Sequence, residues 1–62
     1  MSIQKMALVD LAVRLIKAGY SDTTFSDFEY YPQMEKDFPE VSILTAEEEE
    51  FVIAEMESRI GF

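Results

Sequence analysis

The sequence predicts an all-α fold, a small helical hairpin in which two main helices are joined by one or two short helical turns. Two observations predict it. Apolar residues recur at helical spacing near both ends of the chain, and the stretch between them contains helix-stopping and turn-forming residues. A single short apolar run at 41–44 has no pairing partner, so we expect no sheet. No repeat or linker divides the chain, so we expect residues 1–62 to form one domain.

The first helix is expected from Ile3 to Ala18, and apolar residues cover most of its circumference. With successive residues 100° apart, Asp10, Arg14 and Lys17 gather into one narrow polar stripe. Gly19 can take the left-handed conformation that ends a helix. Packing against one other helix leaves apolar surface uncovered, so we expect a homodimer with symmetric helix contacts. The candidate interface residues are Leu8, Val9, Val13, Leu15 and Ile16.

The middle of the chain predicts short helical turns. Thr24, followed by Asp27 three places later, resembles a capping box that starts a turn or short helix. A second short helix is expected from Pro32 to Phe38, because proline suits the first helical position and Pro39 stops the helix. Residues 41–44 then form an apolar connector, extended or not, that packs against the core.

The last helix is expected from Ala46 to Ile60. Thr45 and Glu48 form a capping-box pattern at its start, and Gly61 closes its other end. Antiparallel packing of the two long helices is the simplest arrangement, because a connection of about 26 residues can return the chain. One apolar stripe faces the first helix and consists of Val52, Ile53, Met56 and Ile60.

Length and composition limit how this fold can be stabilised. A chain of 62 residues buries only about 60% of the surface that its unfolded form exposes. It has no Cys and no His, which excludes disulfides and leaves no usual ligands for a structural zinc ion. Oligomerisation is the remaining supplement to a small core.

The sequence favours a soluble cytoplasmic protein without membrane contact. The absence of Cys fits a reducing compartment. The apolar run of the first helix is interrupted by charged residues, is too short to span a bilayer and does not end in a cleavage site. Its narrow stripe of mixed charge also lacks the broad basic face of a membrane-surface helix.

The net charge of −8 is unevenly distributed along the chain. Residues 1–20 carry three basic side chains and one acidic side chain, whereas residues 21–62 carry twelve acidic and two basic ones. Phosphates would repel such a chain, so we expect no direct binding to nucleic acid. The charge favours instead a protein partner with a basic surface.

Catalysis and metal binding are not expected. Without His and Cys, the chain lacks the commonest general base and the thiolate nucleophile. The carboxylate pairs Asp27 with Glu29 and Asp37 with Glu40 have no apolar pocket that would make one an acid and the other a base. The carboxylates of Glu47–Glu50 point about 100° apart on a helix, so they cannot converge on a hard cation. We therefore expect no enzyme activity, no cofactor and no metal ion.

The aromatic and acidic residues of the middle segment permit two interpretations. They could form a partner-binding surface, in which charge steers association and aromatic rings supply buried area. Alternatively, Phe25, Phe28 and Phe38 form the lid of a small core with the acids outside, and the sequence favours this interpretation. The candidate partner-binding residues are Asp27, Glu29, Tyr30, Tyr31 and Asp37, of which the two tyrosines are the best candidates for exposed contacts.

The run LAVRLIKAGYSD leading into FSDFEYYPQMEKDFPE, in a short acidic chain without Cys or His, resembles the small early-region proteins of temperate phages. The nearest likeness is to proteins of the exo to xis interval of lambdoid phages. This resemblance implies a small helical accessory factor that perturbs host or phage regulation in the host cytoplasm, by binding and not by catalysis.

Three functional hypotheses follow from the sequence. The first is a small acidic regulator or inhibitor that binds another protein through the middle segment. The second is a structural or accessory subunit of a larger assembly that docks through its apolar first helix. The third is a DNA mimic that inhibits a nucleic-acid-binding protein by placing acids where phosphates would lie.

Overall fold

Five helical segments follow one another in the computed structural model, which describes residues 2–60 and the side chains of residues 5–60. They are α1 (Ser2–Lys17), the 3₁₀ helix η1 (Asp22–Ser26), α2 (Tyr31–Asp37), the 3₁₀ helix η2 (Pro39–Ile43) and α3 (Ala46–Ile60). Residues 2–60 contain no strand, so the prediction of an all-α fold is confirmed for this range. The predicted end of the last helix at Gly61 lies outside the described residues.

The end of α1 follows the sequence prediction. Gly19 has a φ of 95°, a left-handed conformation that glycine adopts at little cost. Its amide donates to the Ile16 carbonyl at 3.0 Å, and the Tyr20 amide donates to the Leu15 carbonyl at 3.0 Å. These two bonds form a Schellman motif, which satisfies carbonyls that a helix end leaves free. Tyr20 then packs against the core, as the residue after the glycine commonly does.

The start of α3 also follows the sequence prediction. The Thr45 amide donates to Glu48 Oε1 at 2.9 Å, and the Glu48 amide donates to Thr45 Oγ1 at 3.2 Å, which completes the capping box. Three glutamates occupy the first turn, where the helix dipole favours negative charge. Val52 and Met56 are fully buried, and Ile53 and Ile60 are half-buried, so the predicted apolar stripe is the inner face.

The turn from η1 to α2 differs from the prediction. Ser21 caps η1, and the hydroxyl of buried Thr24 accepts a hydrogen bond from the Ser21 amide at 3.1 Å, so the predicted start at Thr24 and Asp27 is wrong. Asp27 instead organises the next turn. Its Oδ1 accepts from the amides of Glu29 at 2.8 Å and Tyr30 at 3.2 Å, a local bond pattern in which Asp is favoured.

The segment after α2 is helical and not extended. The predicted short helix is present with a shift of one residue, and Pro32 lies in its first turn. Pro39–Ile43 forms η2, in which Val41 is buried while Ile43 is 79% exposed. The connector therefore packs on the core through Val41 and half-buried Leu44, but it does not bury its other isoleucine.

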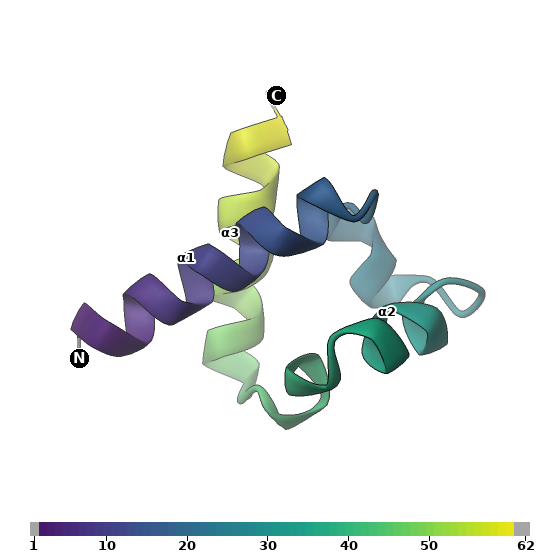
Figure 1. The fold of residues 1–62 in the computed structure, drawn as a ribbon, viewed down its shortest axis with the longest axis horizontal. Helices are drawn as coiled ribbons and strands as arrows, with labels where there is room; N and C mark the ends of the chain where they lie inside the picture. Colours follow the sequence, from purple (N-terminus) through teal and green to yellow (C-terminus); the bar gives the residue numbers. More distant parts are fainter. Residues whose placement is uncertain (1, 61–62) are drawn as a thin grey trace.

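The core lies where α1 and α3 contact each other. Figure 1 shows α1 passing obliquely across α3, so the predicted antiparallel hairpin is not observed. The connection is itself folded into η1, α2 and η2, and it covers one side of the crossed pair instead of only reversing the chain (Figure 1). The seven buried core residues are Leu11, Ala12, Leu15, Met34, Val41, Val52 and Met56.

Candidate functional site

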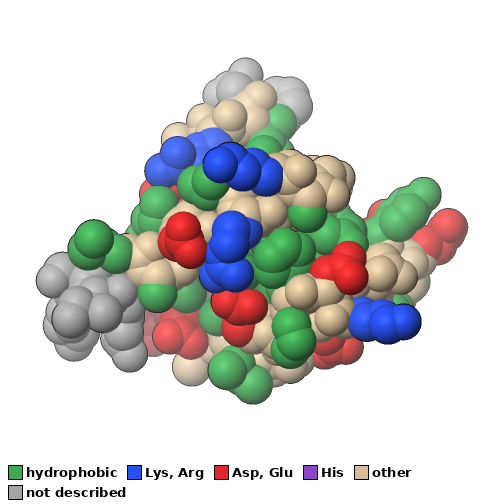
Figure 2. All heavy atoms as spheres, in the orientation of Figure 1, with side chains coloured by type: hydrophobic (Ala, Val, Ile, Leu, Met, Phe, Trp, Pro, Cys, Tyr) green, Lys and Arg blue, Asp and Glu red, His purple; other side chains and the backbone are tan. Residues whose placement is uncertain are grey.

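The loop at residues 27–30, here called the Phe28 loop, carries the most exposed large apolar side chain described in this structure. Phe28 is 97% exposed, Tyr30 is 59% exposed, and Glu29 between them is exposed. Hydrophobic and acidic side chains protrude together at the right-hand edge of Figure 2, where the connection from η1 to α2 lies in Figure 1. An aromatic ring held out in water beside carboxylates has no role in the core.

The Phe28 loop is fixed to the fold through Asp27. Besides the two bonds to its carboxylate, the Asp27 carbonyl accepts from the Tyr31 amide at 2.9 Å. Asp27 is therefore a positioning residue for this loop, and exchanging it would change the loop conformation as well as the charge. Glu29 is the predicted acid whose side chain can be changed without breaking these bonds.

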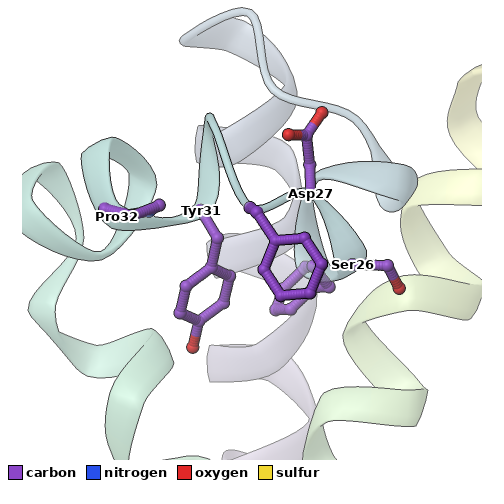
Figure 3. A pocket seen from close by; sticks show the side chains of 6 residues that line it. Ser26, Asp27, Tyr31 and Pro32 are labelled. Atoms are coloured by element: carbon purple, nitrogen blue, oxygen red, sulfur yellow. The ribbon is translucent and has the colours of Figure 1, made fainter.

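A shallow apolar hollow of about 400 Å³ lies beside the loop. Figure 3 shows the Tyr31 ring on one side of the chain and the Asp27 carboxylate pointing to the other side. The loop thus presents a protruding ring next to a surface that can receive an apolar group. The residues that line the hollow are Phe25, Ser26, Asp27, Phe28, Tyr31 and Pro32.

The raised pKa of Tyr31 indicates a negative electrostatic potential near this hollow. Partial burial raises the pKa of the Tyr31 phenol, and the charges of Glu35 and Glu49 raise it further. The acids of α2 and α3 therefore act together on this region. A positively charged group brought to the hollow would be attracted by the same field.

The lid interpretation holds for two of the three phenylalanines. Phe25 packs against the core and its ring lies 6.3 Å from the Tyr31 ring, centroid to centroid. Phe38 also packs on the core, in an edge contact with Tyr20 at 6.3 Å. Phe28 does not belong to the lid, and half-buried Tyr31 is not the exposed contact residue that the sequence predicted.

Asp37 lies at the other end of α2, away from the Phe28 loop, and binds within the fold. Its Oδ2 accepts from the Tyr20 hydroxyl at 2.6 Å, and its Oδ1 accepts from Gln33 Nε2 at 3.2 Å. These bonds lower the pKa of Asp37, with a smaller contribution from the charge of Lys36. The bond to Asp37 in turn raises the pKa of Tyr20. This predicted partner-binding residue is therefore a link between α1 and α2.

Arg14 is a second link, whose pairing with Asp10 is expected from their spacing of four residues and whose contact with Glu40 sequence reasoning missed. Its Nε contacts Asp10 Oδ2 at 3.0 Å, and its Nη2 contacts Glu40 Oε2 at 2.9 Å, so it joins α1 to η2. The guanidinium also lies 5.8 Å from the centre of the Phe38 ring. Both acids of the pair Asp37 and Glu40 are thus bound to other groups and do not face each other as acid and base.

The predicted dimer interface divides into two faces of α1. Leu15 is fully buried in the core, so it is not available to a partner, whereas Leu8 and Ile16 are half-buried and pack partly against the core. Val9 and Val13 are half-buried and line an open hollow of about 610 Å³. The outer face of α1, defined here as Met6, Val9, Val13 and Ile16, therefore replaces the predicted set.

Two residues of this surface were missed by the sequence interpretation. Met6 is 70% exposed, and Phe51 reaches the same hollow from α3. Met6 could have been found from its spacing of three and seven residues to Val9 and Val13, which places it on their stripe. Phe51 could not, because it lies off the α3 stripe and only the crossing of the helices brings it near Val9.

Neither a metal centre nor a membrane span is found in the part of the chain that the structure describes. No three or more His, Cys, Asp or Glu side chains group there as ligands, and no helix there is long and apolar enough to cross a bilayer. The chain matches no protein family, no curated protein and no solved structure.

Proposed function

We propose that this chain is a small acidic regulator or inhibitor that acts in the cytoplasm by binding another protein, without catalysis. The Phe28 loop is the binding element, and the partner offers an apolar pocket with a basic rim. The observation that carries the proposal is the 97% exposure of Phe28 next to Glu29 on a loop that Asp27 holds in place.

The exposure of Phe28 supplies the energy for binding. Moving a fully exposed phenylalanine into an apolar pocket contributes about 1.5–3 kcal/mol. A binding energy concentrated in one or two aromatic side chains is typical of protein interfaces. Because three hydrogen bonds to Asp27 already order the loop, little conformational entropy remains to be lost on binding.

The negative net charge of the chain steers the approach of a basic partner. With a net charge of −8, the chain attracts a basic surface over distances comparable with the Debye length. Such attraction raises the association rate and weakens with added salt. Glu29 places one of these charges directly beside the inserted ring.

The outer face of α1 supports a second part of the proposal, a homodimer. An accessory subunit of a larger assembly would use the same face, so the two hypotheses differ only in which protein covers it.

DNA mimicry has less support. On the face shown in Figure 2, acidic side chains lie beside basic ones and do not form a continuous row, and Arg14 is paired with two of them.

The proposal is tested with two single substitutions and a matched control. We expect immobilised wild-type protein to capture a distinct protein from a bacterial lysate, and Phe28→Ala to lose it. Ile43→Ala removes a similarly exposed apolar side chain, 79% exposed, from another part of the surface and should not change capture. With the purified partner, Phe28→Ala should weaken binding by about tenfold or more, equivalent to about 1.4 kcal/mol.

Charge is tested separately from the ring. Glu29→Lys should lower the affinity and flatten its dependence on salt, while circular dichroism stays unchanged because the loop bonds involve the Glu29 backbone only. Equal capture by Phe28→Ala and wild-type protein, or capture by neither, would contradict the proposal. Release of the captured protein by duplex DNA would favour the DNA mimic instead.

A further inference from the structure

The outer face of α1 forms a continuous apolar groove along the helix. One hollow of about 610 Å³ is lined by Met6, Val9 and Val13, with Phe51 at its edge. A second hollow of about 200 Å³ is lined by Val13 and Ile16, with the basic residues Lys17 and Arg59 at its edge. The two hollows meet at Val13, so the groove follows one face of the helix over three turns.

The spacing of the groove residues matches a coiled-coil seam. Positions 6, 9, 13 and 16 are separated by three, four and three residues, which is the alternation of a and d positions in a heptad. Met6 and Val13 then occupy a positions, and Val9 and Ile16 occupy d positions. This stripe is separate from the inner face of α1, on which Leu11 and Leu15 are buried.

The charges beside the groove complement a second copy of the same helix. In this heptad Lys5 occupies the g position that precedes the seam and Asp10 occupies the following e position, and both line the larger hollow. In parallel two-stranded coiled coils, a g residue faces the e residue five places later on the other helix. Asp10 is 69% exposed while it contacts Arg14 through one oxygen, so it remains accessible.

We propose that a second copy of this chain covers the groove, with the two α1 helices parallel and in register. Lys5 of each copy then faces Asp10 of the other, and the seam residues meet their own counterparts. This inference rests on the proposed homodimer and specifies its interface. An antiparallel pairing that matches Val9 with Val13 brings the two Asp10 side chains toward each other and loses both ion pairs.

The overall charge also favours this face for self-association. Each chain carries −8, so contact between two copies is opposed wherever acids face each other. Basic side chains outnumber acidic ones by three to one in residues 1–20, whereas acidic side chains outnumber basic ones by twelve to two in residues 21–62. Pairing through α1 therefore brings together the least acidic part of each chain, and α3 borders the groove only through Phe51 and Arg59.

An engineered disulfide tests the register, because the natural chain contains no Cys. Val9→Cys places one thiol on the seam, and in a parallel dimer it lies beside the same residue of the partner subunit. We expect oxidation to convert Val9→Cys, and separately Val13→Cys, almost completely into a covalent dimer that keeps its helical circular dichroism. Ile43→Cys, exposed outside the groove, should form no covalent dimer on oxidation at low concentration.

A charge exchange tests the ion pairs. Lys5→Glu and Asp10→Lys should each weaken the dimer several-fold, because like charges then face each other twice. An equimolar mixture of the two variants should form a heterodimer at least as tight as the wild-type dimer, since one pair keeps its original sign and the other is restored with reversed sign. The measurements are solution mass over a range of concentrations and native mass spectrometry of the mixture.

The alternative outcomes are distinct. A wild-type chain that stays monomeric at every concentration overturns both the homodimer and the register, and it leaves the Phe28 loop proposal to its own test. A dimer in which only a mixture of Val9→Cys and Val13→Cys chains crosslinks overturns the parallel register and indicates an antiparallel one. A dimer that neither thiol crosslinks places the interface elsewhere.

Discussion

The two long helices are nearly equal in length, 16 residues in α1 and 15 in α3, but they use their surfaces differently. α3 has one apolar face, which is buried through Val52 and Met56, and a first turn rich in glutamate. α1 buries Leu11 and Leu15 on its inner face and still carries apolar residues on its outer face. The packing requirement of α3 is thus met within one chain, whereas α1 has more apolar surface than one chain can cover.

This difference separates folding from assembly. The inner faces of both helices hold the monomer together, so they should be equally important to stability. The outer face of α1 has no counterpart on α3, where the solvent side carries residues such as Glu57. Substitutions on the inner face of α1 should therefore change the folding equilibrium, and those on its outer face should change dimer formation. Substitutions on either side of α3 should act on the folding equilibrium only.

The largest expected effect comes from the shared core. Leu15→Ala in α1 and Met56→Ala in α3 each remove a side chain with no exposed surface and leave a cavity. Each should lower the free energy of unfolding by about 2–5 kcal/mol, which in a domain of this size comes close to unfolding it. Urea titration followed by circular dichroism measures the change, and loss of helical signal without urea also meets the prediction.

The control for this prediction lies on the solvent side of α3. Glu57→Ala removes an exposed side chain from the same helix and should change stability by less than about 0.5 kcal/mol. If Leu15→Ala were as mild as Glu57→Ala, the inner face of α1 would not be the core face. If only Met56→Ala were severe, the two helices would not share one core.

A smaller effect is expected at the start of α3. Thr45→Ala removes the hydroxyl that accepts from the Glu48 amide at 3.2 Å and should cost about 0.5–2 kcal/mol. Thr45→Ser keeps a hydroxyl at the same place and should behave like the wild type. Thermal unfolding of the three proteins, at one concentration, gives the comparison. Equal loss in both variants would show that packing of the threonine methyl group matters and capping does not.

The helix ends could be predicted from the sequence because they depend on neighbouring residues. The capping box at Thr45 and the glycine at position 19 act through backbone groups within one turn. The relative placement of α1 and α3 could not be predicted in the same way. Both faces of α1 are apolar, so the pattern does not show which face packs inward, and the predicted interface mixed buried Leu15 with accessible Val9.

The candidate site was predicted in part for a related reason. Glu29 and Tyr30 are exposed in the loop as expected, but Phe28 was assigned with Phe25 and Phe38 to the lid of the core. Asp27 turns the chain away from the core, since its carboxylate binds the two amides that follow Phe28. The available signal was Asp27 itself, because an aspartate side chain commonly accepts a hydrogen bond from the backbone amide two residues later. The link between Asp37 and Tyr20 joins distant segments, and no local pattern indicates it.

The smallest expected effect concerns this link, which ties the residues after α1 to the end of α2. Asp37 has a pKa below its ordinary value of 3.8, so its bond stabilises the fold above that pH and is lost as the pH falls through the lowered pKa. Tyr20 has a pKa above its ordinary value of 10.0, so its contribution is present below pH 10.0 and is lost as the pH rises through the raised pKa.

Tyr20→Phe should therefore be less stable than the wild type near neutral pH, and the difference should shrink in acid and in alkali. Tyr30→Phe, in the Phe28 loop, is the matched control, and a wild-type advantage over Tyr20→Phe that stayed constant into strong acid would show that the bond to Asp37 is not its source.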